Sequence, residues 1–182
     1  RSWLDVVNWY RAGAGLPAVT DNPVWSDGIR KHIDYLNNTP PQYLTGQYAN
    51  WHTENPASPW YTPEGAAAAQ SSDLGGWGTS DRESIEGWIT APFHAVGIIR
   101  RNLTQAAYYR QPSGGGAGLD VIRGLSGGSG AAPVLFPGPN SVVGLHSMGA
   151  EVPNPVERCG YTTGPGLPMM ALLPQAPPAG TT

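Results

Sequence analysis

Cysteine and lysine are almost missing from this chain, which has one of each, Cys159 and Lys31, among its 182 residues. A single cysteine excludes an internal disulfide framework and a CxxC metal site. Charged residues make up only 13% of the chain and the formal net charge is −3, so no basic stripe is available to follow a phosphate backbone. We therefore expect no nucleic-acid partner, and we expect Cys159 to be a buried, unreactive thiol.

Long apolar runs are absent as well. No stretch approaches the length of a membrane span, and we expect that no signal peptide precedes Arg1. A helical pattern begins directly after Arg1, so we expect the sequence to be a mature or trimmed form. We also expect no membrane span.

Glycine, proline and large aromatic residues are plentiful. The chain has 25 glycines and 19 prolines, which favour stiff, irregular connections, and 7 tryptophans and 8 tyrosines, which disordered segments avoid. A hydrophobic fraction of 40% is enough for a packed core. We predict one domain over residues 1–173 and a proline-rich C-terminal tail over residues 174–182.

Helical patterns fill the first half of the chain and strand patterns fill the second. Capping residues, first-turn prolines and apolar spacing predict helices that begin near Trp3, Pro23, Pro63 and Asp81, and Pro92 either ends the last of these or starts another turn. After residue 103, short apolar runs at 105–111, 118–125, 132–138, 141–148 and 166–174 alternate with glycine and proline clusters, as strands do. This segregation predicts an α+β fold and not alternating βαβ units.

Two of the four histidines stand out. His32 lies on the second predicted helix and His146 in a predicted strand, and we expect structural roles for both. His52 and His94 each lie beside carboxylates in sequence that is otherwise poor in charge. Neutral imidazoles beside carboxylates can bind a divalent metal or relay protons, or they can simply fix a long loop by hydrogen bonds.

Five stretches resemble one known family. They are "VVNWYRAGAGLPAV" at 6–19, "HTE" at 52–54, "YTPEG" at 61–65, "IEGWITAPFHAVGII" at 85–99 and "GAEVPNPVERCGYTTGPGLPMMAL" at 149–172. In order and spacing they resemble the CAP superfamily of cysteine-rich secretory, antigen 5 and pathogenesis-related proteins, in its compact bacterial SCP-like form. The resemblance covers roughly residues 2 to 173.

The resemblance implies a three-layer α-β-α sandwich with a small antiparallel sheet between helical layers. Such proteins are secreted or cell-surface proteins, and their central cleft is lined by two histidines and two acidic residues. In some members the cleft holds zinc or another divalent metal. On the matching motifs, His52 and His94 are the cleft histidines, and hence the candidate metal ligands, and Glu64 is the first acidic residue.

The second acidic residue of the family pattern is missing. Ala91 stands three residues after Trp88, where the family often has glutamate. Glu54 or Glu86 are the possible substitutes, although the motif assigns the role to neither. A weaker metal site, or none, follows.

Three functions are consistent with these residues. The first is a monomeric, non-enzymatic binding module outside the cytoplasm, whose cleft, flanked by Trp51 and Trp60, takes a metal, a peptide, a lipid or other small apolar ligand, or a partner protein. The second is a metal-assisted hydrolase with His52 and His94 as ligands and Glu64 as general base. The third is a structural or interaction domain with a vestigial, hydrogen-bonded cleft. We favour the first and expect no enzymatic activity.

Overall fold

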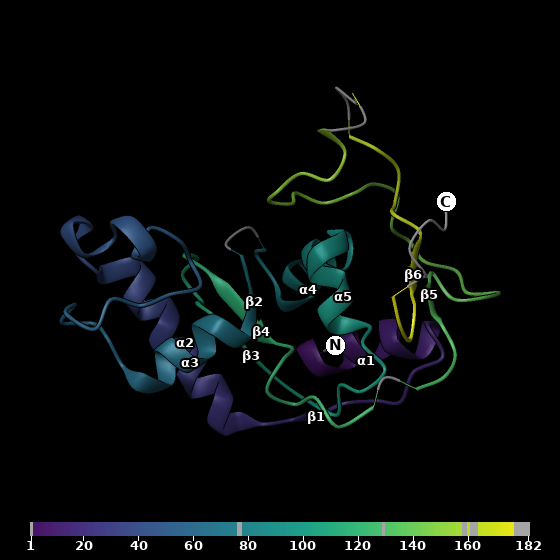
Figure 1. Ribbon diagram of the computed structural model, residues 1–182, viewed down its shortest axis with the longest axis horizontal. Coiled ribbons are helices and arrows are strands. Elements are labelled where there is room, and N and C mark those ends of the chain that lie inside the picture. The colour runs from purple at the N-terminus through teal and green to yellow at the C-terminus, as the bar shows by residue number, and fades with distance from the viewer. Residues whose placement is uncertain (1, 76–77, 129, 158–159, 161–163, 177–182) are drawn as a thin grey trace.

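A computed structural model describes residues 2–75, 78–128, 130–157, 160 and 164–176 of the chain (Figure 1). Cys159, which we expected to be buried, lies outside the described residues, as do residues 177–182 of the predicted tail.

The four predicted helices form, and Pro92, which could have ended the fourth, instead starts a fifth. They are α1 (Trp3–Gly13), α2 (Pro23–Asn38), α3 (Pro63–Ser71), α4 (Asp81–Ile89) and α5 (Pro92–Ile98). The hydroxyls of Ser2, Thr62 and Ser80 accept hydrogen bonds from backbone N–H groups in the first turns of α1, α3 and α4. Proline occupies the first position of the other two helices, where its missing N–H costs nothing. The long connection between α2 and α3 contains two short 3₁₀ helices, Pro41–Tyr43 and Gly46–Tyr48.

The central sheet is mixed, which differs from the antiparallel sheet that the resemblance implied. Its strands β1 (Thr20–Asp21), β2 (Ser72–Gly75), β3 (Gln105–Arg110) and β4 (Ala117–Asp120) lie in the order β1-β3-β4-β2. The β3–β4 and β4–β2 pairs are antiparallel, but the two-residue strand β1 is parallel to β3. Parallel pairing needs a long crossover, and here helices α2 to α5 lie between the two strands in the sequence.

A second, two-stranded antiparallel sheet joins β5 (Val134–Phe136) and β6 (Met170–Leu172). The strand predicted over 141–148 does not form. Val143 and Leu145 pack against the main core, but the only strand-like contact described in this run is an isolated bridge from Ser147 to Gly166. Alternating burial alone does not make this run a strand. Without a neighbouring strand, its backbone N–H and C=O groups have no partners for the hydrogen bonds of a sheet.

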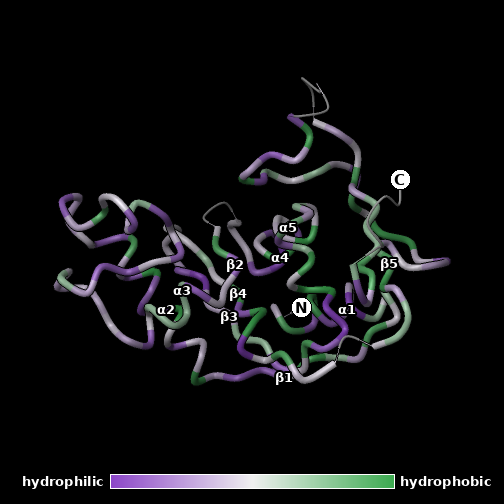
Figure 2. The backbone as a smooth tube through the Cα atoms, viewed as in Figure 1, coloured by the Kyte–Doolittle hydropathy of each residue, from purple (hydrophilic) through white to green (hydrophobic). Residues whose placement is uncertain are grey.

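Helices cover both faces of the central sheet, so the predicted α+β, three-layer arrangement is confirmed (Figure 1). Along β3 the side chains alternate: Ala106 and Tyr108 belong to the core shared with α1, α4 and α5, whereas Ala107 packs with α2 and α3. On β4, a Cβ atom at Gly118 would lie 2.6 Å from a side-chain carbon of Ile29, so glycine there lets α2 approach the sheet closely. In Figure 2 the hydrophobic segments gather around β3, β4 and α1, while much of the 39–62 connection is hydrophilic.

A buried arginine ties the ends of several elements together. Arg11, near the end of α1, is fully buried and donates hydrogen bonds to four backbone carbonyls, those of Pro17, Ile98, Arg100 and Leu103, at 2.6 to 3.0 Å. Burial lowers the pKa of Arg11 to about 10, so the guanidinium keeps its charge at neutral pH. The cation is therefore stabilised by carbonyl dipoles.

Within the described residues, no helix combines the length and the apolar character that crossing a membrane requires.

Candidate functional site

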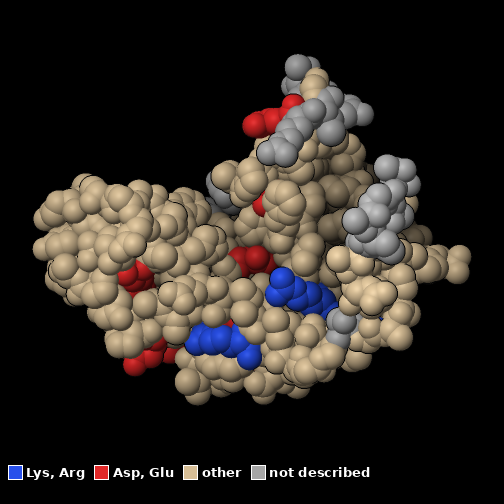
Figure 3. Space-filling view, in the orientation of Figure 1, with Lys and Arg blue, Asp and Glu red and all other residues tan. Residues whose placement is uncertain are grey.

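The surface is hollowed between two parts of the molecule, one carrying α2, α3 and the 39–62 connection and the other carrying α4, α5 and the chain after β5 (Figure 3). On the α2 side lies a pocket of about 240 Å³, and on the α4 side one of about 210 Å³. Both pockets reach Gly75, the last residue of β2. The end of β2 therefore lies between the two walls of one cleft.

His52 stands on the wall formed by the 39–62 connection. Its Nδ1 lies 2.9 Å from the carbonyl oxygen of Ala69 in α3. Because a carbonyl oxygen can only accept, this nitrogen carries a proton, and in the neutral ring the proton-free nitrogen is Nε2. The side chain is exposed, as expected for a residue that meets a ligand.

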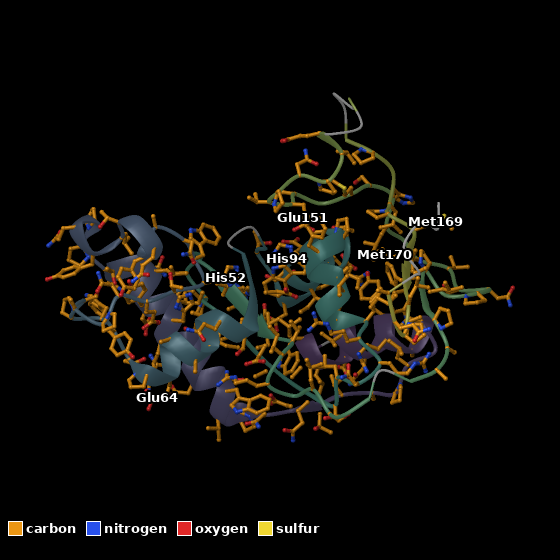
Figure 4. The ribbon with its side chains drawn as sticks, in the orientation of Figure 1. His52, Glu64, His94, Glu151, Met169 and Met170 are labelled. Atoms are coloured by element: carbon orange, nitrogen blue, oxygen red, sulfur yellow. The ribbon has the colours of Figure 1, made fainter. Side chains whose placement is uncertain are left out.

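His94 stands in the first turn of α5, on the other wall. Its Nδ1 lies 2.6 Å from Oε1 of Glu151, although the direction of this contact falls outside hydrogen-bond geometry. The other oxygen of Glu151 accepts a hydrogen bond of 2.7 Å from the backbone N–H of Phe93. His52 and His94 lie on either side of the hollow, and Glu151 lies beside His94 (Figure 4).

Glu151 was missed as a candidate by sequence reasoning. A signal was present, because Glu151 is one of only two carboxylates in the glycine- and proline-rich sequence after Asp120, within one of the family-like segments. Its side chain has no exposed surface, whereas carboxylates are rarely buried without a partner.

Glu64, the expected acidic residue of the cleft, lies elsewhere. Its side chain is 60% exposed, and its carboxylate lies 3.3 Å from Nζ of Lys31 in α2 (Figure 4). In α3 the next residue, Gly65, faces inward and is buried, so the helical rotation turns Glu64 outward. Its position near the start of α3 is favoured by the helix dipole and needs no ligand to explain it.

Neither possible substitute lies in the cleft. The carboxylate of Glu54 is buried 2.8 Å from Nδ1 of His32 and also accepts a hydrogen bond from the backbone N–H of Thr62. Glu86 pairs with Arg82 on α4 and accepts a hydrogen bond from the hydroxyl of Tyr10 on α1. Each carboxylate is thus occupied by a structural contact.

His32 has the structural role that we expected. Its ring is fully buried between Glu54 and the carbonyl oxygen of Trp51, which lies 2.7 Å from Nε2. His32 therefore fixes the residue that immediately precedes His52. His146, by contrast, is exposed.

Asp73 on β2 is a further buried carboxyl group that the sequence reasoning missed. Its Oδ2 has no hydrogen-bond partner among the described residues. Burial, and then the charge of Glu151, raise the pKa of Asp73 well above its ordinary value of 3.8, with a further contribution from Asp120 and an opposing one from Arg100. Asp73 and Glu151 are therefore close enough to interact electrostatically.

Asp73→Asn should change how stability depends on pH. A raised pKa means that the folded protein holds this proton more tightly than the unfolded chain does. Its stabilising effect is present below the ordinary pKa of 3.8 and is lost as pH rises toward the folded-state pKa. Urea unfolding from about pH 4 to pH 8 should show wild type losing stability relative to Asp73→Asn. The loss should be about 1.4 kcal/mol for every tenfold difference in proton affinity between the folded and unfolded states.

The control for this measurement is Asp27→Asn. The hydrogen bond from Arg30 lowers the pKa of exposed Asp27, so its effect has the opposite sign. The prediction is contradicted if the free energy of unfolding of wild type, minus that of Asp73→Asn, stays constant or rises with pH.

The described residues do not fit the zinc site that the resemblance implied. Both histidines hold Nδ1 against an oxygen atom, which is how metal-ligating histidines are oriented. However, the part of the chain that the structure describes contains no group of three or more histidine, cysteine, aspartate or glutamate side chains placed to hold a metal. Zinc sites in proteins use three or four such ligands.

Comparison with known proteins supports the same family as the motifs. The sequence model of the CAP family, described as the cysteine-rich secretory protein family, matches residues 4–122, which is more than half of the chain. The chain belongs to the CAP family. No match was found among the curated proteins or among the solved structures. The matched region of this CAP protein contains both cleft histidines and Asp73, and it ends before Glu151.

Proposed function

We propose that this CAP protein is a non-enzymatic binding module whose cleft takes a small molecule or peptide with an apolar part and hydrogen-bond donors. The pocket on the α2 side carries the proposal. It combines apolar and aromatic walls with two amides, and its lining includes Leu36, Asn37, Leu44, Tyr48, Asn50, Trp51 and Leu74. Apolar walls with a few polar groups are typical of ligand pockets.

The hydrogen bonds of the histidines support binding in preference to nucleophilic catalysis. Nucleophilic catalysis by serine or cysteine needs a base within hydrogen-bond reach of the nucleophile. Among the described residues, the Nδ1 atoms of His32, His52 and His94 lie 2.6 to 2.9 Å from a carbonyl or carboxylate oxygen, and these rings form no described hydrogen bond with a hydroxyl group. An extracytoplasmic location is part of the proposal and rests on family membership, since CAP proteins are typically secreted.

Trp51 provides the test, because its ring is half exposed beside the pocket that it lines. Wild type and Trp51→Ala are titrated by native mass spectrometry and calorimetry with zinc chloride, a series of fatty acids and a library of short peptides. We expect at least one apolar or peptide ligand to bind, and Trp51→Ala to weaken it by 10-fold or more, since losing a central aromatic contact costs about 2 kcal/mol or more.

The matched control is Trp60→Ala. Trp60 is exposed to a similar extent, 43% against 50% for Trp51, but does not line the pocket. The proposal fails if no species in the panel binds, or if both tryptophan variants weaken binding equally. Binding of zinc alone favours a metal function. Loss of thermal stability in Trp51→Ala with unchanged binding favours a structural role.

A further inference from the structure

The part of the chain that follows the family match, after residue 122, returns to the cleft. There it packs against the junction of α4 and α5. The backbone N–H of Gly149 donates to the carbonyl oxygen of Thr90 at 3.1 Å, and that of Met148 donates to Pro165. A Cβ atom at Gly149 would lie 2.6 Å from Oγ1 of Thr90 and 2.9 Å from the carbonyl oxygen of Gly87. Only glycine allows this close approach, which brings Glu151 to the first turn of α5.

Both oxygens of Glu151 face α5. One contacts Nδ1 of His94 and the other accepts the Phe93 N–H, so the carboxylate spans the ring and the backbone of the same turn. The side chain of Glu151 is fully buried, whereas that of His94 is 22% exposed. Nδ1 of His94 is buried, and its nearest described acceptor is this carboxylate. The exposed part of the ring is therefore the part away from Glu151.

We propose that Glu151 is a positioning residue for His94, which keeps a proton on Nδ1 and presents a proton-free Nε2 to the cleft. In the neutral ring, the partner of one nitrogen decides the state of the other. His52 is held in the same tautomer by the carbonyl oxygen of Ala69. The two cleft histidines then act as hydrogen-bond acceptors, so the ligands that suit them carry hydroxyl, amide N–H or ammonium donors.

The ligand preference rests on the proposed function, but the tautomer does not. The test uses the full chain labelled with ¹⁵N and long-range ¹H–¹⁵N spectra of the imidazole rings at about pH 8, above the ordinary histidine pKa of about 6.5. In wild type we expect Nδ1 of His94 to be protonated and Nε2 to be free. In Glu151→Ala we expect the proton to move to Nε2, and in Glu151→Gln, which keeps one acceptor oxygen, we expect partial retention on Nδ1.

Glu157→Ala is the matched control, because Glu157 is an exposed glutamate in the same segment. It should leave the tautomer of His94 unchanged. Backbone amide spectra confirm that each variant is folded. If Glu151→Ala does not fold, the wild-type tautomer and Glu151→Gln still decide the matter.

The proposal is overturned if wild-type His94 carries its proton on Nε2, or if folded Glu151→Ala keeps the wild-type tautomer. A second experiment repeats the ligand panel of the proposed function with these variants. Folded Glu151→Ala should bind ligands that carry hydrogen-bond donors about 10-fold more weakly than Glu157→Ala does, equivalent to about 1.4 kcal/mol. Equal affinities overturn the predicted ligand preference. A panel without any ligand overturns the proposed function and leaves the tautomer result standing.

Discussion

Glu54→Ala should lower the free energy of unfolding by about 3–5 kcal/mol, the usual cost of removing one partner from a buried ion pair. Glu54 lies in an irregular connection, where substitutions are often tolerated, but its carboxylate is buried against the ring of His32. Both ring nitrogens of His32 face acceptors, Glu54 and the carbonyl oxygen of Trp51. Each of these two contacts needs one proton, so the ring and the carboxylate together must carry two.

Alanine removes both contacts, which makes it a sharper test than glutamine. The carboxylate of Glu54 faces the His32 ring with one oxygen and accepts the Thr62 N–H with the other. A glutamine could still accept from Thr62 with its oxygen and donate to Nδ1 with its NH₂ group, whereas alanine leaves the Thr62 N–H and Nδ1 of His32 without their partner. The protein would then bury an unsatisfied polar group, which is costly in an apolar environment.

Thermal and urea unfolding of Glu54→Ala and Glu64→Ala make a direct comparison. Glu64 lies ten residues further on, near the start of α3, but it is exposed, and its ion pair among the described residues is with Lys31. We expect Glu64→Ala to cost far less than Glu54→Ala, because exposed ion pairs contribute little to stability. Equal stability losses in the two variants would show that the His32–Glu54 pair is not a buried anchor of this loop.

Arg11→Met should be equally damaging, with an expected loss of about 3–5 kcal/mol, since four backbone carbonyl groups, two of them in buried contacts and two in partly buried ones, lose their donor together. Methionine approximately fills the volume of the aliphatic part but donates no hydrogen bond. Because the acceptors lie in the segment after α1 and in the connection from α5 to β3, we expect the loss to loosen the contact between α1 and the sheet.

Arg30→Met is the control for Arg11→Met. Arg30 makes two short ion pairs, with Asp27 and Asp34, but its side chain is 42% exposed. If charge pairing alone decided stability, Arg30→Met would cost more than Arg11→Met, because Arg11 has no described carboxylate partner. We expect the reverse, and urea unfolding that shows Arg11→Met within about 1 kcal/mol of wild type would contradict the buried-donor explanation.

Local patterns in the sequence predicted the helices well. The starts of α1, α3 and α4 depend on a capping hydroxyl within three residues of its partner, and such contacts are encoded by neighbours in the chain. The α+β class followed from the order of these patterns. The run at 141–148 was wrongly predicted as a strand because alternation does not provide a second strand.

The cleft could be predicted only in part. The family motifs led to His52 and His94, and the structure places them on the two walls of the hollow. The motif that led to Glu64 could not show which side of α3 this residue would face. Nor could spacing distinguish Glu54 from Glu64, since both are near His52 in the sequence and only burial against His32 separates them.

The sequence by itself determined most of the helix starts and the α+β class, and it selected the two histidines as candidates, because each depends on residues within a few positions of one another or on a motif. The tertiary structure decided which carboxylates meet them. Glu151 reaches α5 from a segment that begins more than fifty residues later, because Gly149 permits close packing against the α4–α5 junction. Contacts of this kind depend on the energy of packing whole elements together, which no local pattern of residues contains.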